Sequence, residues 1–324
     1  MNRRRWAFSA LLALGLPPLR ALAQPLSSRA IRIVVPFGPG GVADLTVRSV
    51  AQKMAASLGQ SIVVDNKPGA GGVVAASTVA NAAPDGHTLL LMSNGTAVSA
   101  GLFASLPYDT VKDFAPISTL GSFDLAVLVA ANSPITSMRT LIAEAKARPG
   151  RLNIATVQVG STQHLAAELL KSTLNIDVQV VPFNGTPAVV TALRGGQVDA
   201  AVEILAPVTS QITGKALRGL AVMGARRARS LPDVPTVAES DAAAKGFDVT
   251  SWNALAAPAR TPPDVIARLN REVNAALAAP ELRRQLQEWG VEARGSTPAQ
   301  QAALLASEIQ RWSAVIQRAG IPKQ

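Results

Sequence analysis

The chain has 324 residues, 48% of them hydrophobic and 16% charged, which suits two packed domains and excludes a disordered protein. It has no cysteine and only two histidines, which excludes disulfides and a cysteine nucleophile and argues against a transition-metal site. The formal net charge of +10 is explained equally well by attraction of an anionic partner and by a generally basic proteome. The basic residues are not interleaved with aromatic residues, which argues against nucleic-acid binding.

The N-terminus has the pattern of a secretory signal peptide over residues 1–23. Three arginines precede the apolar run from Trp6 to Leu16, and Ala21-Leu22-Ala23 matches a cleavage site that leaves Gln24 as the first mature residue. Pro17-Pro18 interrupts the run, so an uncleaved anchor is the less favoured alternative. The arginines followed by Trp6 leave twin-arginine export open. We therefore expect a periplasmic protein whose mature chain does not span a membrane.

From residue 30 onward, short apolar runs alternate with amphipathic patterns, separated by glycine and proline. Continuous apolar runs predict buried strands over 31–35, 61–64, 88–92, 125–130, 152–156, 178–183, 198–205 and 217–223. Helical spacing predicts helices over 45–58, after 72, and over 141–147, 163–171, 185–195, 263–277, 280–289 and 298–316. Asp44 is predicted to cap the first helix and Gly59 to end it. This βαβαβ order is typical of a doubly wound sheet.

No low-complexity linker separates the two halves of the chain. Two sheets without a linker indicate that strands cross between domains and form a hinge. We expect a discontinuous first domain over 30–123 plus 250–324 and a second domain over 124–249, with a ligand cleft between them. The last helix, over 298–316, is expected to pack on the first domain.

Three strand-to-helix junctions consist of glycine and other small residues: Pro36 to Gly41, Lys67 to Gly72, and Val159 to Thr162. Such junctions direct free backbone N–H groups and a helix dipole at one point, which suits an anion such as a carboxylate. The nucleotide-binding fingerprints are absent, so a nucleotide is not expected. Each junction taken alone is more often a tight turn, so their spacing does not decide the function.

A larger set of motifs resembles the Bug-type receptors of tripartite tricarboxylate transporters. These motifs follow one another over essentially the whole mature chain, at 35–44 with Arg48, 69–72, 84–90, 106–109 with 113–114, 160–161 with 164–165, 181–183 with Gly185, 195–198, 231–236, Trp252, 257–258 and 311–312. The resemblance implies a type II periplasmic-binding (Venus flytrap) fold, in which two doubly wound α/β domains joined by crossing strands close on a ligand carboxylate.

The resemblance also implies which loops hold the carboxylate, mainly through main-chain N–H groups and ordered waters. In the first domain these loops correspond to Phe37, Gly38, Pro39, Gly40, Gly41, Val42, Ala43 and Asp44, and to Ser93, Asn94 and Thr96 in a loop after the third strand. In the second domain they correspond to Gln158, Val159, Gly160, Ser161 and Thr162, and to Phe183, Asn184 and Gly185.

Two positions depart from the family pattern. Val157-Gln158-Val159 stands where the family usually has more glycine, and Phe183-Asn184 where it commonly has tyrosine followed by a basic residue. Losing that hydroxyl and that charge weakens the hold on a second carboxylate. We therefore expect a monocarboxylate, an amide or another less charged ligand to be preferred to citrate.

An enzymatic alternative rests on Ser161 and His164, which share one face of a helix start. A hydrolase also needs an oxyanion site and an orienting acid, and the G-x-S-x-G elbow is absent, so Ser161 is better interpreted as a helix cap. Trp252 lines the cleft or, slightly better supported, fills a core. We expect a monomeric receptor without cofactor, metal or catalytic residue. Its ligand is a small organic carboxylate (a mono- or dicarboxylate, an amino acid or an aromatic acid), which it delivers to the membrane subunits of a tripartite tricarboxylate-type transporter. A periplasmic sensor for a kinase remains the alternative.

Overall fold

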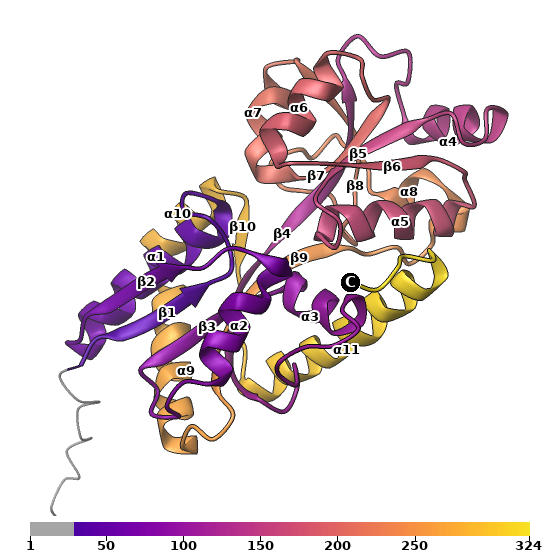
Figure 1. Cartoon of the computed structure of the whole chain (residues 1–324). Coiled ribbons are helices and arrows are strands. Elements are labelled where there is room, and N and C mark those ends of the chain that lie inside the picture. The colour runs from indigo at the N-terminus through magenta and orange to yellow at the C-terminus, as the bar shows by residue number, and fades with distance from the viewer. Residues whose placement is uncertain (1–28) are drawn as a thin grey trace, which may run out of the picture.

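The computed structural model describes residues 29–324, so the predicted signal peptide and its cleavage site lie outside the described residues. Figure 1 shows two lobes, and the long strand β4 (Phe114–Ala130) runs from one into the other. No helix within 29–324 is long and apolar enough to cross a membrane.

The first lobe begins with the predicted alternation of strands and helices. Its elements are β1 (Ile31–Val35), α1 (Val42–Leu58), β2 (Ile62–Asn66), the short 3-10 turn η1 (Ala70–Gly72), α2 (Val73–Ala80), β3 (Thr88–Ser93) and α3 (Asn94–Leu102). β1 pairs in parallel with both β2 and β3. Gly59 adopts a left-handed conformation with φ +63° and ends α1, as predicted.

Strand β4 is much longer than the strand predicted over 125–130. It begins at Phe114, because the backbone remains extended through residues that break the apolar pattern, among them Pro116, Gly121 and Asp124. Its first part pairs with β9 (Thr250–Pro258), and its last part pairs with β7 (Ala200–Ile204) and β8 (Leu217–Val222). One strand therefore belongs to the ladders of both lobes.

Strand β9 is not among the strands predicted from apolar runs, and the first helix predicted after Trp252 begins only at Pro263. Ala254, Ala256 and Ala257 favour a helix by intrinsic propensity, but all three are fully buried in a strand. β9 lies between β3 and β4 and is antiparallel to both. Tertiary pairing overrides local preference here. The order of the strands is β2-β1-β3-β9-β4-β7-β5-β6, and β8 and β10 also pair with β4.

The second lobe confirms most of the predicted elements. They are α4 (Met138–Ala147), β5 (Asn153–Val157), α5 (Thr162–Leu174), β6 (Gln179–Phe183), α6 (Thr186–Arg194), β7, α7 (Leu205–Thr213), β8, α8 (Val237–Ser240) and the 3-10 turn η2 (Ala242–Ala244). The strand predicted over 198–205 ends at Ile204, and the unpredicted helix α7 follows at once. Ile204 at its N-cap offers no side-chain hydrogen bond, so the usual start signal is absent.

The C-terminal part returns to the first lobe with the three predicted helices. They are α9 (Pro263–Ala278), α10 (Pro280–Glu288) and α11 (Pro298–Arg318), with the unpredicted strand β10 (Val291–Ala293) before the last of them. A Cβ on Gly121 would lie 2.7 Å from the carbonyl oxygen of Glu292, so glycine allows β10 to pair with β4.

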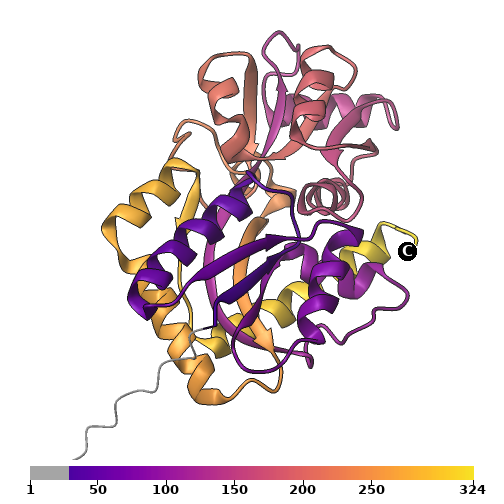
Figure 2. The same ribbon diagram turned by 60° about the vertical axis from the view of Figure 1, so that its left-hand side comes forward.

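Helix α11 packs on α3 and β4, as expected for the first lobe, and also reaches α5 of the second lobe. Figures 1 and 2 show its C-terminal part beside α3 and below α5. A Cβ on Gly101 would lie 2.7 Å from the Ser313 hydroxyl, so this glycine permits the close approach of α3 and α11. Trp312 is fully buried in a core cluster that contains residues of both lobes. The two lobes therefore share part of one apolar core.

Candidate functional site

Asp44 orders the first glycine-rich junction, although it is not the cap of α1 that the sequence predicted. The N-cap is Gly41, without a side-chain hydrogen bond, and Asp44 is the third residue of the helix. Its Oδ2 accepts hydrogen bonds from the Gly40 N–H (2.9 Å) and from Arg48 Nε (2.9 Å). The carboxylate lies in the first turn of α1, where the helix dipole favours a negative charge.

Asn66, the last residue of β2, also holds the same junction through hydrogen bonds. Its Nδ2 donates to Asp44 Oδ1 at 2.8 Å and to the carbonyl oxygen of Phe37 at 2.9 Å. The residues from Phe37 to Gly41 remain exposed. The first N–H groups of α1 have no partner inside the helix, so they are available to a ligand at this end.

Burial by itself would raise the pKa of Asp44, but its three hydrogen bonds outweigh burial and hold the pKa below 3.8. Asp44 therefore contributes stability at neutral pH that is lost as pH falls through its folded-state pKa. We expect Asp44→Asn to lower the free energy of unfolding by about 1 kcal/mol at pH 7. The difference from the wild type should shrink at pH 2.5, as measured by urea unfolding. Asp65→Asn, which breaks the more exposed pair with Arg32, is the control and should cost less.

The segment Ser93 to Thr96 is not the loop that the resemblance implied. Ser93 ends β3 and caps α3: its Oγ accepts from the Gly95 N–H at 3.1 Å, and the Ser93 N–H donates to Thr96 Oγ1 at 3.2 Å. The side chain of Asn94 is buried and donates to the Thr250 carbonyl oxygen at 3.1 Å. The strand passes directly into the helix, so this end of the first-lobe sheet carries a second helix N-terminus.

In the second lobe, Ser161 is the predicted helix cap. Its Oγ accepts from the His164 backbone N–H at 3.1 Å and donates to the Val157 carbonyl oxygen at 2.9 Å. The imidazole of His164 is buried, its Nδ1 has no hydrogen-bond partner, and burial lowers its pKa. The serine hydroxyl thus contacts the main chain of His164 and does not form a Ser–His pair.

The two predicted second-lobe loops adjoin at the carboxyl ends of β5 and β6. The Gln158 N–H donates to the Phe183 carbonyl oxygen at 3.1 Å, and Gln158 Nε2 lies 3.5 Å from Asn184 Oδ1. Gly185 caps α6 with φ +93°, a conformation that favours glycine. Val159 is 43% exposed, so this part of the loop is open to solvent.

The second-lobe loops meet the first lobe at α3 and β9. A Cβ on Gly160 would lie only 2.6 Å from Leu102 Cδ2, and Thr162 Oγ1 lies 3.5 Å from Ser251 Oγ. Within 29–324, no hydrogen bond of the structure joins the Phe37–Asp44 junction to these loops. The structure therefore brings the α3 and β9 region together with the second-lobe loops, and leaves the first junction on its own lobe.

Trp252 is 4% exposed and belongs to the core cluster shared by the lobes, which agrees with the core interpretation. Its Nε1 has no hydrogen-bond partner, and the neighbouring Asn253, 1% exposed, has none for either side-chain atom. Asn253 pairs in register with Ser93 and Gly121. Sequence reasoning did not consider Asn253, although an asparagine within an apolar strand was a visible signal.

Glu203 is the second residue that sequence reasoning missed. Its side chain is fully buried near the end of β7, and burial raises its pKa to about 7 despite hydrogen bonds from Gln163, Thr186 and the Ile204 N–H. A lone acid in the apolar run from Ala200 to Leu205 was the signal that could have identified it. Buried charges without a partner are rare in structural cores.

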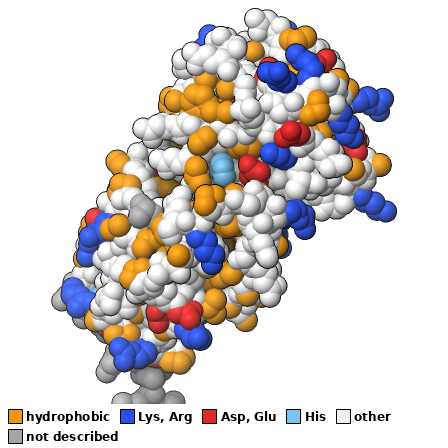
Figure 3. Space-filling view, turned by 45° about the vertical axis from the view of Figure 1, so that its right-hand side comes forward, with side chains coloured by type: hydrophobic (Ala, Val, Ile, Leu, Met, Phe, Trp, Pro, Cys, Tyr) orange, Lys and Arg blue, Asp and Glu red, His pale blue; other side chains and the backbone are white. Residues whose placement is uncertain are grey.

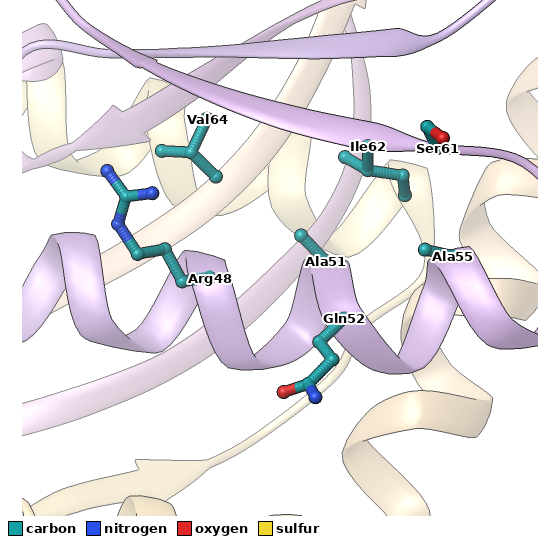
Figure 4. Close-up of a pocket in the computed structure, with 7 residues that line it drawn as sticks. All are labelled: Arg48, Ala51, Gln52, Ala55, Ser61, Ile62 and Val64. Atoms are coloured by element: carbon teal, nitrogen blue, oxygen red, sulfur yellow. The ribbon is translucent and has the colours of Figure 1, made fainter.

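Figure 4 shows a groove between α1 and β2 whose lining includes Arg48, Ala51 and Val64. On the face in Figure 3, Lys and Arg side chains are spread over both lobes with acidic side chains among them. This face therefore offers no continuous basic surface of the kind that nucleic-acid binding requires.

Comparison with known proteins gives one consistent result. The model of the tripartite tricarboxylate transporter family receptor matches residues 46–321. The protein BugT of Bordetella pertussis is 36% identical over 306 residues, covering 92% of this chain and 93% of BugT.

Solved structures agree with that match. The periplasmic binding protein BugD superposes with a TM-score of 0.79 at 31% identity, covering 91% of this chain and 99% of BugD. An R. palustris protein solved with adipate superposes with a TM-score of 0.82 at 32% identity, covering 92% of this chain and 99% of that protein. MatC of Rhodopseudomonas palustris with bound malate superposes with a TM-score of 0.77 at 33% identity, covering 90% of this chain and 99% of MatC.

Proposed function

Because the chain belongs to the receptor family of the tripartite tricarboxylate transporters, we propose that it is a periplasmic solute-binding protein for a small organic carboxylate. It is exported by its N-terminal signal, works as a monomer without catalysis, and delivers its ligand to the membrane subunits of such a transporter. The family and the periplasmic-binding fold expected from the sequence motifs are confirmed.

One observation supports carboxylate capture above the others: in both lobes, helices follow the ends of sheet strands either at once or after a short loop. α1 and α3 follow β1 and β3 in the first lobe, and α5 and α6 follow β5 and β6 in the second. The glycine caps of α1 and α6 make no side-chain hydrogen bond, and Ser93 and Ser161 each accept from only one N–H of their helices, so other first-turn N–H groups remain available to an anion. Ligands of open α/β sheets bind at the carboxyl ends of the strands.

Capture requires the lobes to move. The proposed domains, 30–123 plus 250–324 and 124–249, divide the chain inside β4 and at the start of β9, so these strands are the hinge. Ligand contacts with both lobes favour the closed state, and the closed state docks on the transporter. Two neighbours of similar fold hold dicarboxylates, malate and adipate, which supports a carboxylate of that size range.

The test is a thermal-shift screen of the mature chain against mono-, di- and tricarboxylates, amino acids, ω-amides and aromatic acids. A ligand at a hundredfold excess over its Kd stabilises the native state by about 2.7 kcal/mol, so one chemical class should raise Tm clearly. Recovery of the ligand unchanged separates a receptor from an enzyme. A folded, ligand-free protein that responds to no carboxylate would contradict the proposal.

A further inference from the structure

Glu203 lies at the point where β4 enters the second lobe. In the β4–β7 ladder it is opposite Ala126, and Ile204 is opposite Leu125. The first-lobe ladder of β4 ends at Asp124, which is opposite Thr250 of β9. Glu203 is therefore separated from the first-lobe ladder by two positions of β4, although its own strand belongs to the second lobe.

Two of the residues that hold Glu203 lie in the first turns of α5 and α6. Oε2 accepts hydrogen bonds from Gln163 Nε2 at 3.3 Å, from Thr186 Oγ1 at 3.0 Å and from the Ile204 N–H at 3.2 Å. Gln163 is the second residue of α5 and Thr186 the first of α6, so each follows a loop of the candidate site. Glu203 is thus hydrogen-bonded to the N-terminal turns of both α5 and α6 in the second lobe.

The other oxygen, Oε1, has no hydrogen-bond partner although the side chain is fully buried. No ion pair within 29–324 includes Glu203, and no neighbouring charge is among the causes of its shifted pKa. A buried polar atom left in this state costs free energy unless another molecule supplies the missing bond.

We propose that Glu203 determines ligand specificity by accepting a hydrogen bond from a donor, an ammonium or amide N–H, at the end of the ligand opposite its carboxylate. The proposal rests on the proposed function and extends it by naming the far end of the ligand. The α1, α3, α5 and α6 N-termini supply N–H donors for the carboxylate, whereas Glu203 supplies the acceptor that an ammonium or amide needs. A ligand with both groups matches both parts of the site.

The same arrangement disfavours a second carboxylate on the ligand. A carboxylate placed near Oε1 would either repel the ionised Glu203 or require it to remain protonated. Phe183-Asn184, at the neighbouring strand end, brings no cation that could offset this repulsion. The geometry therefore separates this chain from a receptor for dicarboxylates.

Isothermal titration calorimetry on the mature protein at pH 7.5 tests the proposal with four series of acids of matched chain length. They are the simple monocarboxylates from propanoate to hexanoate, the ω-amino acids from 3-aminopropanoate to 6-aminohexanoate, the ω-amide acids succinamate and glutaramate, and the dicarboxylates from malonate to adipate. The wild type should bind one ω-amino or ω-amide acid at least tenfold more tightly than the dicarboxylate of that length. In the Glu203→Gln variant, the NH2 group of the amide takes the place of Oε1. This variant should reduce the preference at least tenfold, with little change in affinity for the simple monocarboxylates.

Glu168→Gln, which neutralises a partly buried acid of α5, is the control and should preserve the preference. Glu203→Asp withdraws the carboxylate by one methylene and should reduce the preference without reversing it, which provides a second variant. Equal effects of Glu203→Gln on all four series, or a wild type that prefers dicarboxylates, would overturn the role of Glu203 and leave the carboxylate receptor intact. No binding in any series by folded wild-type protein would overturn both.

Discussion

At pH 8 the Glu203→Gln variant is expected to be more stable than the wild type by about 3 kcal/mol, and at pH 4 the two should be nearly equal. The pKa of Glu203 is about 7 in the folded protein and 4.5 for an ordinary glutamate. Between these values the unfolded chain loses its proton while the folded chain keeps it, so wild-type stability falls as pH rises and levels off above the folded pKa. Glutamine cannot ionise and avoids this loss.

Urea unfolding at pH 4, 5.5, 7 and 8 measures the effect. Other charged or titratable side chains lie on the elements packed against β7, and the control variant is chosen from among them. They are Asp124, His164, Glu168, Lys171 and Arg194. Glu168→Gln is the control, because Glu168 is partly buried and its raised pKa is opposed by Lys171. Its gain in stability between pH 4 and pH 8 should be smaller than that of Glu203→Gln. A Glu203→Gln variant that is equally or less stable at pH 8 would show that Glu203 is ionised in the folded state at little cost.

Gly160→Ala is expected to weaken ligand binding about tenfold, equivalent to about 1.4 kcal/mol. Gly160 has φ +80°, which an L-residue adopts only with strain, and its new Cβ would lie 2.6 Å from Leu102 Cδ2 on α3. Leu102 is 3% exposed and has little room to yield. The methyl group therefore holds the second-lobe loop away from the first lobe, which raises the free energy of the closed state.

Gly196→Ala is the matched control for backbone strain. Gly196 has φ +67°, and a Cβ there meets no atom within 4 Å. Both variants should lose stability through backbone strain, but only Gly160→Ala should bind more weakly in calorimetry with the acid found in the thermal-shift screen. Small-angle scattering should show less compaction on ligand addition for Gly160→Ala. Equal affinity of the two variants would indicate that the Gly160–Leu102 contact does not limit closure.

Local signals predicted much of the architecture. The run from Ile31 to Val35 became β1 and Gly59 ended α1, because strand burial and left-handed glycine are visible within a few neighbouring residues. Ser161 capped α5 for the same reason. Asp44 was predicted to cap α1, but Gly41 occupies the cap position, and Asp44 orders the glycine junction from inside the helix.

The candidate site was less predictable, because its polar groups depend on distant partners. The predicted loops at Gln158 and Phe183 do adjoin, but the resemblance to known receptors carried that prediction. Asn253 and Glu203 resemble ordinary polar interruptions of apolar strands in the sequence. Only their burial without sufficient hydrogen-bond partners marks them as unusual.

By itself the sequence determined the alternation of strands and helices, the glycine junctions and the family, since periodicity, caps and motifs are short-range properties. Only the tertiary structure decided that β4 serves both lobes, that β9 is a strand despite its alanines, and that Gly160 contacts Leu102. Strand pairing and burial depend on residues more than a hundred positions apart, such as Asp124 and Thr250. The unusual state of Glu203 follows from the same packing, because the fold removes water from this carboxyl group and thereby raises its pKa.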